Sequence, residues 1–312
     1  MDVPAWWVAR LGMSQARTWV ADRHGPFAAL SRDALEITGR PRERLVLELL
    51  RRIDAGEGMH PVGNAGHWEQ VWARVAEDFE RTGDVASLRP PFIRSFQPVR
   101  FNGEFRWMED PDWEWHWWEC LRRFVFEEWL ADCPTVVEYG CGSGHNLAAF
   151  AQVDPSKEYF GLDFSESAAR LVIRVGREKG WRLRGLVADV RSALNWQLPV
   201  GAGVLTVGAL EQTGDDWTAF MEDLIRQRPA IVVHVEPIVE WLDPTNLVDY
   251  AAIRHMGARG YWSGFPAWME EREREARVEV VHRYRTGVGS LWIEGYNLFV
   301  WKPGKEVPGG KT

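Results

Sequence analysis

Short apolar runs alternate with helical stretches in the second half of the chain. These runs predict five β-strands, at Thr135–Tyr139, Tyr159–Asp163, Arg184–Asp189, Val204–Val207 and Ile231–Glu236. Strands separated by helices are typical of βαβ units, in which the crossover helix returns the chain to the same edge and makes the sheet parallel. The pattern therefore predicts an α/β fold built on a mostly parallel sheet.

Two further apolar runs follow without a helix between them. They predict strands at Val278–Tyr284 and Tyr296–Trp301, with the glycine-containing segment Thr286–Ser290 as the loop. Consecutive strands joined by a short loop pair antiparallel. We therefore expect a mostly parallel seven-stranded sheet that closes with an antiparallel C-terminal hairpin.

The earlier part of the chain has a helical pattern instead, with leucines recurring among charged residues. Helices are predicted to begin at Ser31–Leu35, to span Arg42–Ile53 and Trp68–Arg81, and to run from Asp110 or Asp112 to about Leu130. The aromatic stretch Phe92–Asp112 is expected to be irregular. We thus expect a mainly helical N-terminal region at 1–130, an α/β domain at 131–302 and a flexible tail at 303–312.

Composition and charge narrow the class of protein. Of the 312 residues, 46% are hydrophobic and 26% are charged, and the net charge is −8. Nucleic-acid enzymes usually carry a basic field that attracts phosphates, so we expect no nucleic-acid partner. No apolar run is long enough to span a membrane, and the first residues lack the pattern of a signal peptide.

Three cysteines without a CxxC pair predict neither a disulfide framework nor a metal site. Reduced thiols and a cytoplasmic location are therefore expected. The sequence leaves a homodimer open.

The strongest local motif follows the first predicted strand of the sheet. Glu138 precedes three alternating glycines, Gly140, Gly142 and Gly144, and a helix follows them. Glycine permits the backbone angles of such a turn and the close approach of a ligand. A dinucleotide-binding GxGxxG motif would need a last glycine at the position of His145, so the spacing here is GxGxG.

The next two predicted strands each end in an acid. Asp163 follows the glycines by about 20 residues, where a carboxylate can accept both hydroxyls of a ribose. Asp163 could also cap the helix that starts near Ser165. Asp189 ends the third strand, where a strand-end aspartate in a turn is an alternative interpretation.

Together, this order of motifs resembles class I S-adenosylmethionine (SAM)-dependent methyltransferases, whose first motif is typically (D/E)xGxGxG. The resemblance covers roughly residues 134–301 and includes the terminal hairpin. It implies a Rossmann-like fold with SAM as cofactor. By resemblance, Glu138 orients the SAM ammonium group, the loop of Gly140, Gly142 and Gly144 wraps its methionine part, and Asp163 binds its ribose. Asp189 and the backbone of Val190 would lie at the adenine.

The acceptor site of this fold lies beyond the carboxyl end of the fourth strand. Glu211 follows that strand and is the best polar candidate to bind an acceptor or take its proton. Glu236 ends the fifth strand, and His145 follows the glycines, so both are further catalytic candidates. The (D/N/S)PP(Y/F) motif of amino-methylating DNA enzymes, the acids of Mg²⁺-dependent enzymes and the two-glutamate loop of arginine methyltransferases do not match.

The N-terminal region is expected to form a lid over this crevice. Arg94, Arg100 and Arg106 lie among aromatic residues that include Trp107, and these four are candidate substrate contacts. Arginines pair with carboxylates or phosphates, and aromatic faces stack on rings or hold cations. The alternative is that the tryptophans, 19 in the chain, mostly bury the N-terminal region against the sheet.

The resemblance thus implies a methyltransferase that acts on an oxygen or nitrogen atom of a small molecule. Two alternatives stay open. The chain could be an aminopropyltransferase-like enzyme of the same fold, or a non-catalytic SAM-binding protein. A comparison of SAM binding with decarboxylated SAM binding would distinguish the first alternative from a methyltransferase. Detection of a methylated product with labelled SAM would distinguish the second.

Overall fold

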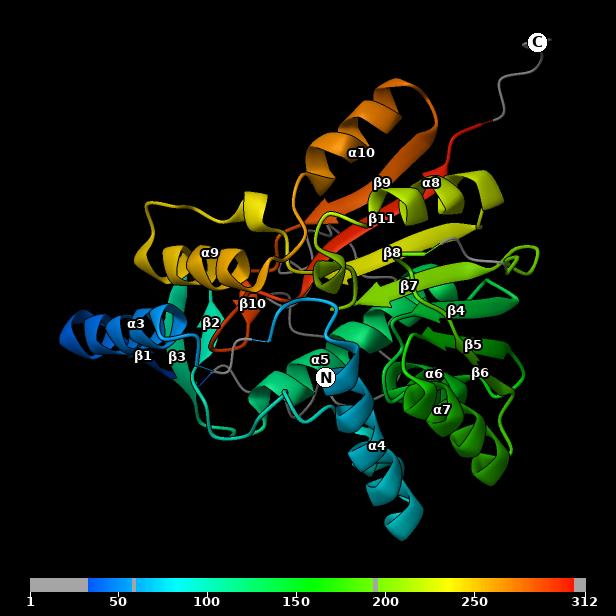
Figure 1. Ribbon diagram of the computed structural model, residues 1–312, viewed down its shortest axis with the longest axis horizontal. Helices are drawn as coiled ribbons and strands as arrows, with labels where there is room; N and C mark the ends of the chain where they lie inside the picture. The colour runs from blue at the N-terminus through cyan, green and yellow to red at the C-terminus, as the bar shows by residue number, and fades with distance from the viewer. Residues whose placement is uncertain (1–32, 58–59, 193–195, 306–312) are drawn as a thin grey trace.

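A seven-stranded sheet forms the centre of the molecule. The computed structural model describes residues 33–57, 60–192 and 196–305. The sheet has the strand order β6-β5-β4-β7-β8-β11-β9 (Figure 1). Its strands are β4 (Thr135–Tyr139), β5 (Glu158–Asp163), β6 (Leu183–Val187), β7 (Gly203–Val207), β8 (Ile231–Glu236), β9 (Val278–Tyr284) and β11 (Asn297–Pro303).

The first five of these strands pair in parallel, and β11 pairs antiparallel with both β8 and β9. This arrangement confirms the predicted mostly parallel sheet with its antiparallel C-terminal pair. Because parallel strands β4, β5 and β6 share one direction, their carboxyl ends lie along one edge.

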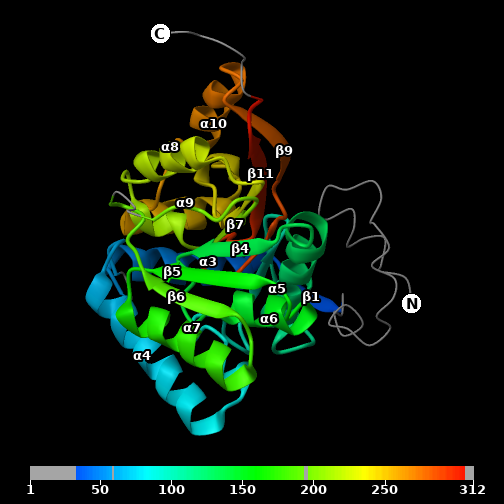
Figure 2. The same ribbon diagram turned by 90° about the vertical axis from the view of Figure 1, so that its right-hand side faces the viewer.

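Helices cover both faces of the sheet, which explains the continuous apolar runs of its inner strands. Successive residues of β4 alternate between two cores: Val136 packs with residues of α5, α6 and α7, and Val137 packs with residues of α8 and α10 (Figure 2). The helices are α3 (Gly39–Asp54), α4 (Ala65–Thr82), α5 (Trp113–Val125), α6 (His145–Val153), α7 (Glu166–Lys179), α8 (Thr218–Gln227), α9 (Leu247–Arg259) and α10 (Phe265–Arg274).

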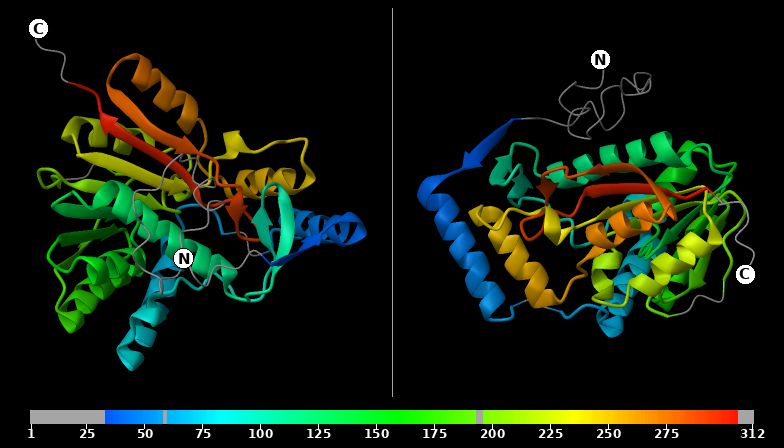
Figure 3. Two further views of the ribbon diagram at one scale, coloured as in Figure 1. Left: turned by 180° about the vertical axis from the view of Figure 1, so that it is seen from behind. Right: turned by 90° about the horizontal axis from the view of Figure 1, so that it is seen from above.

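A second, four-stranded sheet of order β1-β3-β2-β10 stands beside the large one. It joins three strands of the N-terminal region, β1 (Ala34–Ile37), β2 (Val99–Phe101) and β3 (Glu104–Met108), to β10 (Val288–Gly289). Helix α3 packs against α9 next to this sheet (Figure 3). The N-terminal region is therefore tied to the end of the chain as well as to its own helices.

Three local predictions were wrong at this second sheet. Residues 34–37 form an edge strand rather than the start of a helix, because antiparallel pairing with β3 outweighs their helix propensity. The stretch Phe92–Asp112 contains the β2–β3 hairpin, and the predicted loop Thr286–Ser290 contains β10, which pairs with β2. The predicted tail also starts too early, since Pro303 still pairs with Val278.

Other predictions on the N-terminal region agree with the structure. The predicted helices Arg42–Ile53 and Trp68–Arg81 correspond to α3 and α4, and the third corresponds to α5 with a π-helical turn at Phe126–Leu130. Residues 1–32 and 306–312, including Ser31 and most of the predicted tail, lie outside the described residues. Within the described ranges, no helix combines the length and apolarity needed to cross a bilayer.

Candidate functional site

The loop after β4 is held by the neighbouring strand. Gly140, Gly142 and Gly144 have φ angles of 69°, 52° and 71°, a left-handed region that favours glycine. The Gly140 N–H donates to the Leu162 carbonyl at 2.7 Å, and the Gly142 N–H donates to Asp163 Oδ2 at 2.9 Å. The predicted glycine turn and the acid at the end of β5 thus form one unit.

Gly142 also lies directly under a tryptophan. A Cβ at this position would lie 2.5 Å from the ring of Trp72, which projects from α4. No larger residue fits there without moving the ring. The loop can approach Trp72 this closely only because Gly142 has no side chain, and we call this close-packed turn the cradle.

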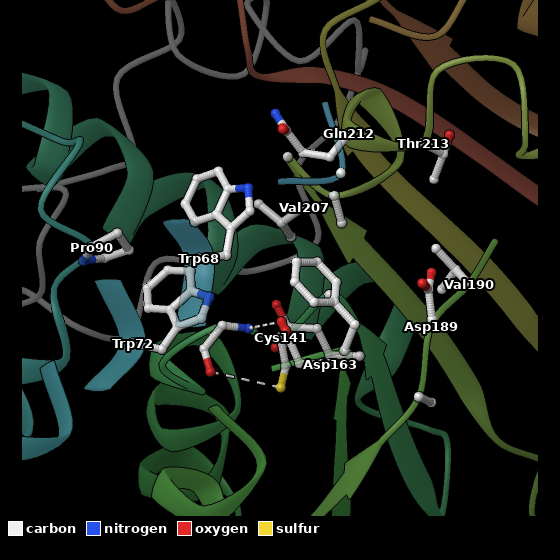
Figure 4. Close-up of a pocket in the computed structure, with 18 of the residues that line it drawn as sticks. Trp68, Trp72, Pro90, Cys141, Asp163, Asp189, Val190, Val207, Gln212 and Thr213 are labelled. Carbon is white, nitrogen blue, oxygen red and sulfur yellow. Dashed lines mark hydrogen bonds between the residues drawn. The ribbon is translucent and has the colours of Figure 1, made fainter. Parts of the chain in front are cut away.

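Asp163 is buried at the floor of the same cavity (Figure 4). Besides the Gly142 N–H, it accepts the N–H of Ser165 at 2.9 Å. Burial raises the pKa of Asp163 to about 6, while the two amide donors oppose this shift. Ser165, not Asp163, caps α7 through the Ala168 N–H, so Asp163 keeps acceptor capacity toward the cavity.

Glu138 has one engaged and one unengaged oxygen. Its Oε1 accepts from Asn146 Nδ2 at 2.7 Å, and its buried Oε2 has no hydrogen-bond partner. Burial raises its pKa to about 8, with the nearby charge of Asp163 adding to the effect. A ligand with a cationic donor would satisfy this oxygen and favour the ionised form.

Asp189 is positioned at the opposite end of the cavity. It forms an ion pair with Arg191, with 2.7 Å between Oδ2 and Nη2, and its pKa is lowered chiefly by that hydrogen bond. Asp189 and Val190 both line the cavity, where the resemblance placed the adenine. Arg191 was not among the predicted site residues, and it competes for the Asp189 carboxylate.

The three strand ends therefore meet at one cavity. All predicted cofactor residues except Gly144 line it: Glu138, Gly140, Gly142, Asp163, Asp189 and Val190. Gly144 packs against α7 instead, since a Cβ on it would lie 2.7 Å from a methyl group of Val172.

Two tryptophans of α4 complete this cavity, and the sequence prediction missed them. Trp68 and Trp72 are stacked with ring centroids 5.7 Å apart, and Figure 4 shows them facing Asp163 from across the cavity. Their spacing of four residues on a helix predicts one shared face. That spacing, combined with the excess of tryptophan, was the signal available in the sequence.

A second cavity, of about 300 Å³, adjoins the first. The two share Trp68, Phe92, His145, Val207 and Gly208, so they are neighbouring chambers at the end of β7. Of the predicted catalytic and substrate residues, Glu211, His145 and Arg94 line the second chamber.

Glu236 is fully buried beneath the loop that follows β7. Its carboxyl group accepts from the N–H groups of Ala209 and Leu210 at 3.1 and 3.2 Å. Burial and the charge of Glu211 raise its pKa well above the ordinary value. Glu236 lines neither chamber and instead fixes the loop that carries Glu211.

His145 lies in the wall of both chambers, but its ring nitrogens are already engaged. Trp118 Nε1 donates to its Nε2 at 3.1 Å, and Nδ1 lies 3.3 Å from Ser143 Oγ. Burial lowers its pKa well below the ordinary value, so the ring is neutral. His234 is similarly held between Thr206 and Trp301, as expected for a core histidine.

Three predicted substrate residues lie away from both chambers. Arg100 is buried and donates to the carbonyls of Val248, Leu291 and Trp292, which ties β2 to α9 and the segment after β10. Arg106 pairs with Glu36, and Trp107 is 45% exposed on β3. The sequence analysis grouped these three residues with Arg94 because they are close in sequence. In the structure they lie on β2 and β3, which belong to the four-stranded sheet.

Comparison with known proteins gives short or distant matches. No protein-family model matches the chain. The tRNA (guanine-N(7)-)-methyltransferase of Hydrogenovibrio crunogenus is 32% identical over 69 residues, which are 22% of this chain. That match spans 29% of the relative's own length.

Solved structures match the chain at low sequence identity and low TM-score. The [4+2]-cyclase SpnF has a TM-score of 0.47 at 14% identity, covering 75% of this chain and 96% of SpnF. A SAM-dependent methyltransferase from Aquifex aeolicus has a TM-score of 0.39 at 14% identity, covering 58% and 88%. One from Geobacter sulfurreducens, in complex with S-adenosyl-L-homocysteine, has a TM-score of 0.38 at 17% identity, covering 54% and 84%.

Proposed function

We propose that this chain, which has the Rossmann-like fold of class I SAM-dependent methyltransferases, is itself a SAM-dependent methyltransferase with a small-molecule acceptor. The observation that carries the proposal is the convergence of Glu138, the glycine loop and Asp163 on one cavity. The unpartnered Glu138 oxygen and the cradle at Gly142 both fit a ligand with a cationic amine that approaches the main chain closely.

Each residue of the first chamber has a distinct role in this proposal. Glu138 holds the SAM ammonium group, Asp163 accepts the ribose hydroxyls, and Asp189 with Val190 borders the adenine. Bound SAM supplies a methyl group on a positively charged sulfur. Trp68 and Trp72 form the wall that α4 places over the loop, and they exclude water from the chamber.

The second chamber supports a small acceptor. Its volume of about 300 Å³ lies at the lower end of the range of ordinary ligand pockets. The net charge of −8 gives no general attraction for phosphate backbones. The acidic balance therefore favours a small molecule over the tRNA substrate named for the short curated match.

The N-terminal region serves as the lid of both chambers in this account. Trp68 and Phe92 come from it and line each chamber, so that neither is complete without residues before 131. A cytoplasmic location is consistent with Cys120, Cys133 and Cys141, which are all buried and unpaired.

Methyl-labelled SAM tests the function. The full chain is incubated with labelled SAM and either a small-molecule extract or bulk tRNA, and the products are separated by size. The proposal predicts label in the small-molecule fraction. Label found only in tRNA, or in neither fraction, would contradict it, and transfer from decarboxylated SAM would instead favour the aminopropyl alternative.

A further inference from the structure

A buried carboxylate without a counter-cation lies at the inner end of the second chamber. Glu211 follows β7 on the 3-10 turn Leu210–Thr213 and is 5% exposed. Its Oε1 accepts from Gln212 Nε2 at 3.1 Å, its buried Oε2 has no amide, hydroxyl or cationic donor, and the carboxyl group of Glu236 is its remaining hydrogen-bond neighbour. Among the described residues, no lysine or arginine forms an ion pair with Glu211.

A second acid, Glu236, lies beneath this carboxyl group. Glu236 contacts Glu211 and is fully buried, so the pair cannot both ionise easily. Burial and the contact with Glu211 raise the pKa of Glu236 well above its ordinary value, so Glu236 holds a proton. A buried carboxyl oxygen without a donor costs free energy unless a ligand supplies one.

The other ionisable groups of the chamber do not supply that donor. Arg52 pairs with Glu57, and Arg259 donates to Gln212 Oε1 at 3.3 Å, so the Gln212 side chain stands between the Arg259 guanidinium and Glu211. Arg94 is exposed at the rim. Glu114 is itself an acid, and both of its oxygens are engaged, by Tyr296 and by Gln97.

The two histidines of the chamber are neutral. Desolvation, followed by the charge of Arg259, lowers the pKa of His255 to about 3, and its buried Nδ1 has no hydrogen-bond partner. His145 is neutral for the reason given above. Beside the guanidinium groups of Arg52, Arg94 and Arg259, the chamber thus offers a ligand the Glu211 carboxyl oxygen and one neutral ring nitrogen.

Aromatic side chains form much of the remaining wall. They are Trp68, Phe92, Trp118, Tyr261, Trp292 and Tyr296. Aromatic faces favour flat apolar bodies and attract cations through their quadrupole. The wall and the carboxylate together favour a ligand that has a ring at one end and a positive donor at the other.

We propose that the methyl acceptor is an amine carried on an aromatic or similarly apolar body, and that Glu211 binds its ammonium group. This inference rests on the proposed function. Glu211 Oε1 lies 3.6 Å from the position that a Cβ on Gly208 would take. Because Gly208 lines both chambers, a nitrogen bound by Glu211 lies where the two chambers meet.

The transfer requires only the acceptor amine, the methyl donor and Glu211. The ammonium R–NH3⁺ gives one proton to the Glu211 carboxylate and becomes R–NH2. The nitrogen lone pair then forms the N–CH3 bond while the donor's C–S bond breaks and leaves its electron pair on sulfur. The product R–NH2⁺–CH3 and neutral S-adenosylhomocysteine result, and Glu211 returns its proton to solvent.

Three ligands that share an indole ring and differ in their terminal group test the proposal. Tryptamine, tryptophol and indole-3-acetate are titrated calorimetrically into the full chain saturated with S-adenosylhomocysteine, so that no turnover occurs. Tryptamine should bind at least about tenfold more tightly than tryptophol, because a charge-assisted hydrogen bond is roughly twice as strong as a neutral one. Glu211→Gln should remove this preference, and Glu43→Gln on the exposed face of α3 should retain it.

The results separate this inference from the function on which it rests. If S-adenosylhomocysteine itself does not bind, the proposed function fails. If it binds, but tryptophol or indole-3-acetate binds as tightly as tryptamine, the amine assignment alone is overturned. Absence of binding by all three probes at millimolar concentration, or an unchanged preference in Glu211→Gln, also overturns it. Binding of S-adenosylhomocysteine by Glu211→Gln shows that this variant is folded.

Discussion

Asp163 connects the glycine loop to the cavity through a single carboxylate. It accepts the N–H groups of Gly142 and Ser165 and has lone pairs left for a ribose. Asp163→Ala should weaken SAM binding at least about tenfold, since hydrogen bonds to charged groups are worth about 1.5–3 kcal/mol. Calorimetry measures the effect, with Asp132→Ala on an exposed turn as the control. Equal affinity in both variants would remove Asp163 from the ribose site.

A substitution at Gly142 tests whether the glycine loop needs its close approach to Trp72. Gly142→Ala adds a Cβ 2.5 Å from Trp72 and places alanine at a φ of 52°. It should lose SAM binding and destabilise the protein by more than the about 1–2 kcal/mol that a left-handed alanine costs. Gly39→Ala isolates that conformational cost, because Gly39 has a φ of 55° and open space around its Cβ. Similar stability losses in both variants would show that Trp72 moves aside.

At the residue scale, the sequence predicted positions better than orientations. The residues Gly140, Gly142 and Asp163 follow buried strands, so their place at the sheet edge is determined by topology. Arg100 and Glu236 lie outside both chambers because their carbonyl and amide partners are set by packing between distant segments. Nothing local in the sequence indicates where such a side chain points.

Helix α4 is the element that closes the first chamber. Its Glu69 accepts from the hydroxyl groups of Ser165 and Ser167 at 2.6 and 2.5 Å, next to the start of α7. These hydrogen bonds lower the pKa of Glu69 and hold Trp68 and Trp72 over the loop. The lid is therefore anchored to the strand end that carries Asp163.

Glu69→Ala should loosen this anchor and speed the release of SAM several-fold, with little change in secondary structure. Stopped-flow dissociation measures the rate, and Glu77→Ala on the exposed face of α4 is the matched control. If Glu69→Ala releases the ligand at the wild-type rate, α4 does not act as the lid.

At the element scale, the long periodic segments were predicted and the short strands were not. The hairpin β2–β3 has an available signal, because Asn102 and Gly103 both have positive φ and an Asn-Gly pair favours this turn. Strands β1 and β10 have no comparable signal. Their four and two residues become strands only by pairing with β3 and β2.

Burial raises the pKa of several carboxyl groups in the interior of the molecule. Burial raises the pKa of Glu114 to about 7, against an ordinary value of 4.5. The folded state therefore holds this proton where the unfolded chain has lost it. The resulting stability is fully present below about pH 4.5 and is lost as the pH rises through about 7.

Glu114→Gln should remove this dependence, because glutamine keeps the shape without the titration. Relative to wild type, the variant should gain up to about 3 kcal/mol of unfolding free energy between pH 5 and pH 8. Urea unfolding at both pH values measures the difference between the two proteins. That difference is the useful quantity, because buried His234 and His255 have lowered pKa values that act in the opposite direction in both proteins. A constant difference would show that Glu114 is ionised throughout.

The proposed function depends most on one adenosyl ligand contacting three strand ends at once. Calorimetric titration of the full chain with S-adenosylhomocysteine tests this directly. We predict saturable binding with one ligand per chain, weakened in Asp163→Ala and unchanged in Asp132→Ala. Absence of any binding heat from either S-adenosylhomocysteine or SAM would contradict the assignment of the first chamber and, with it, the proposed function.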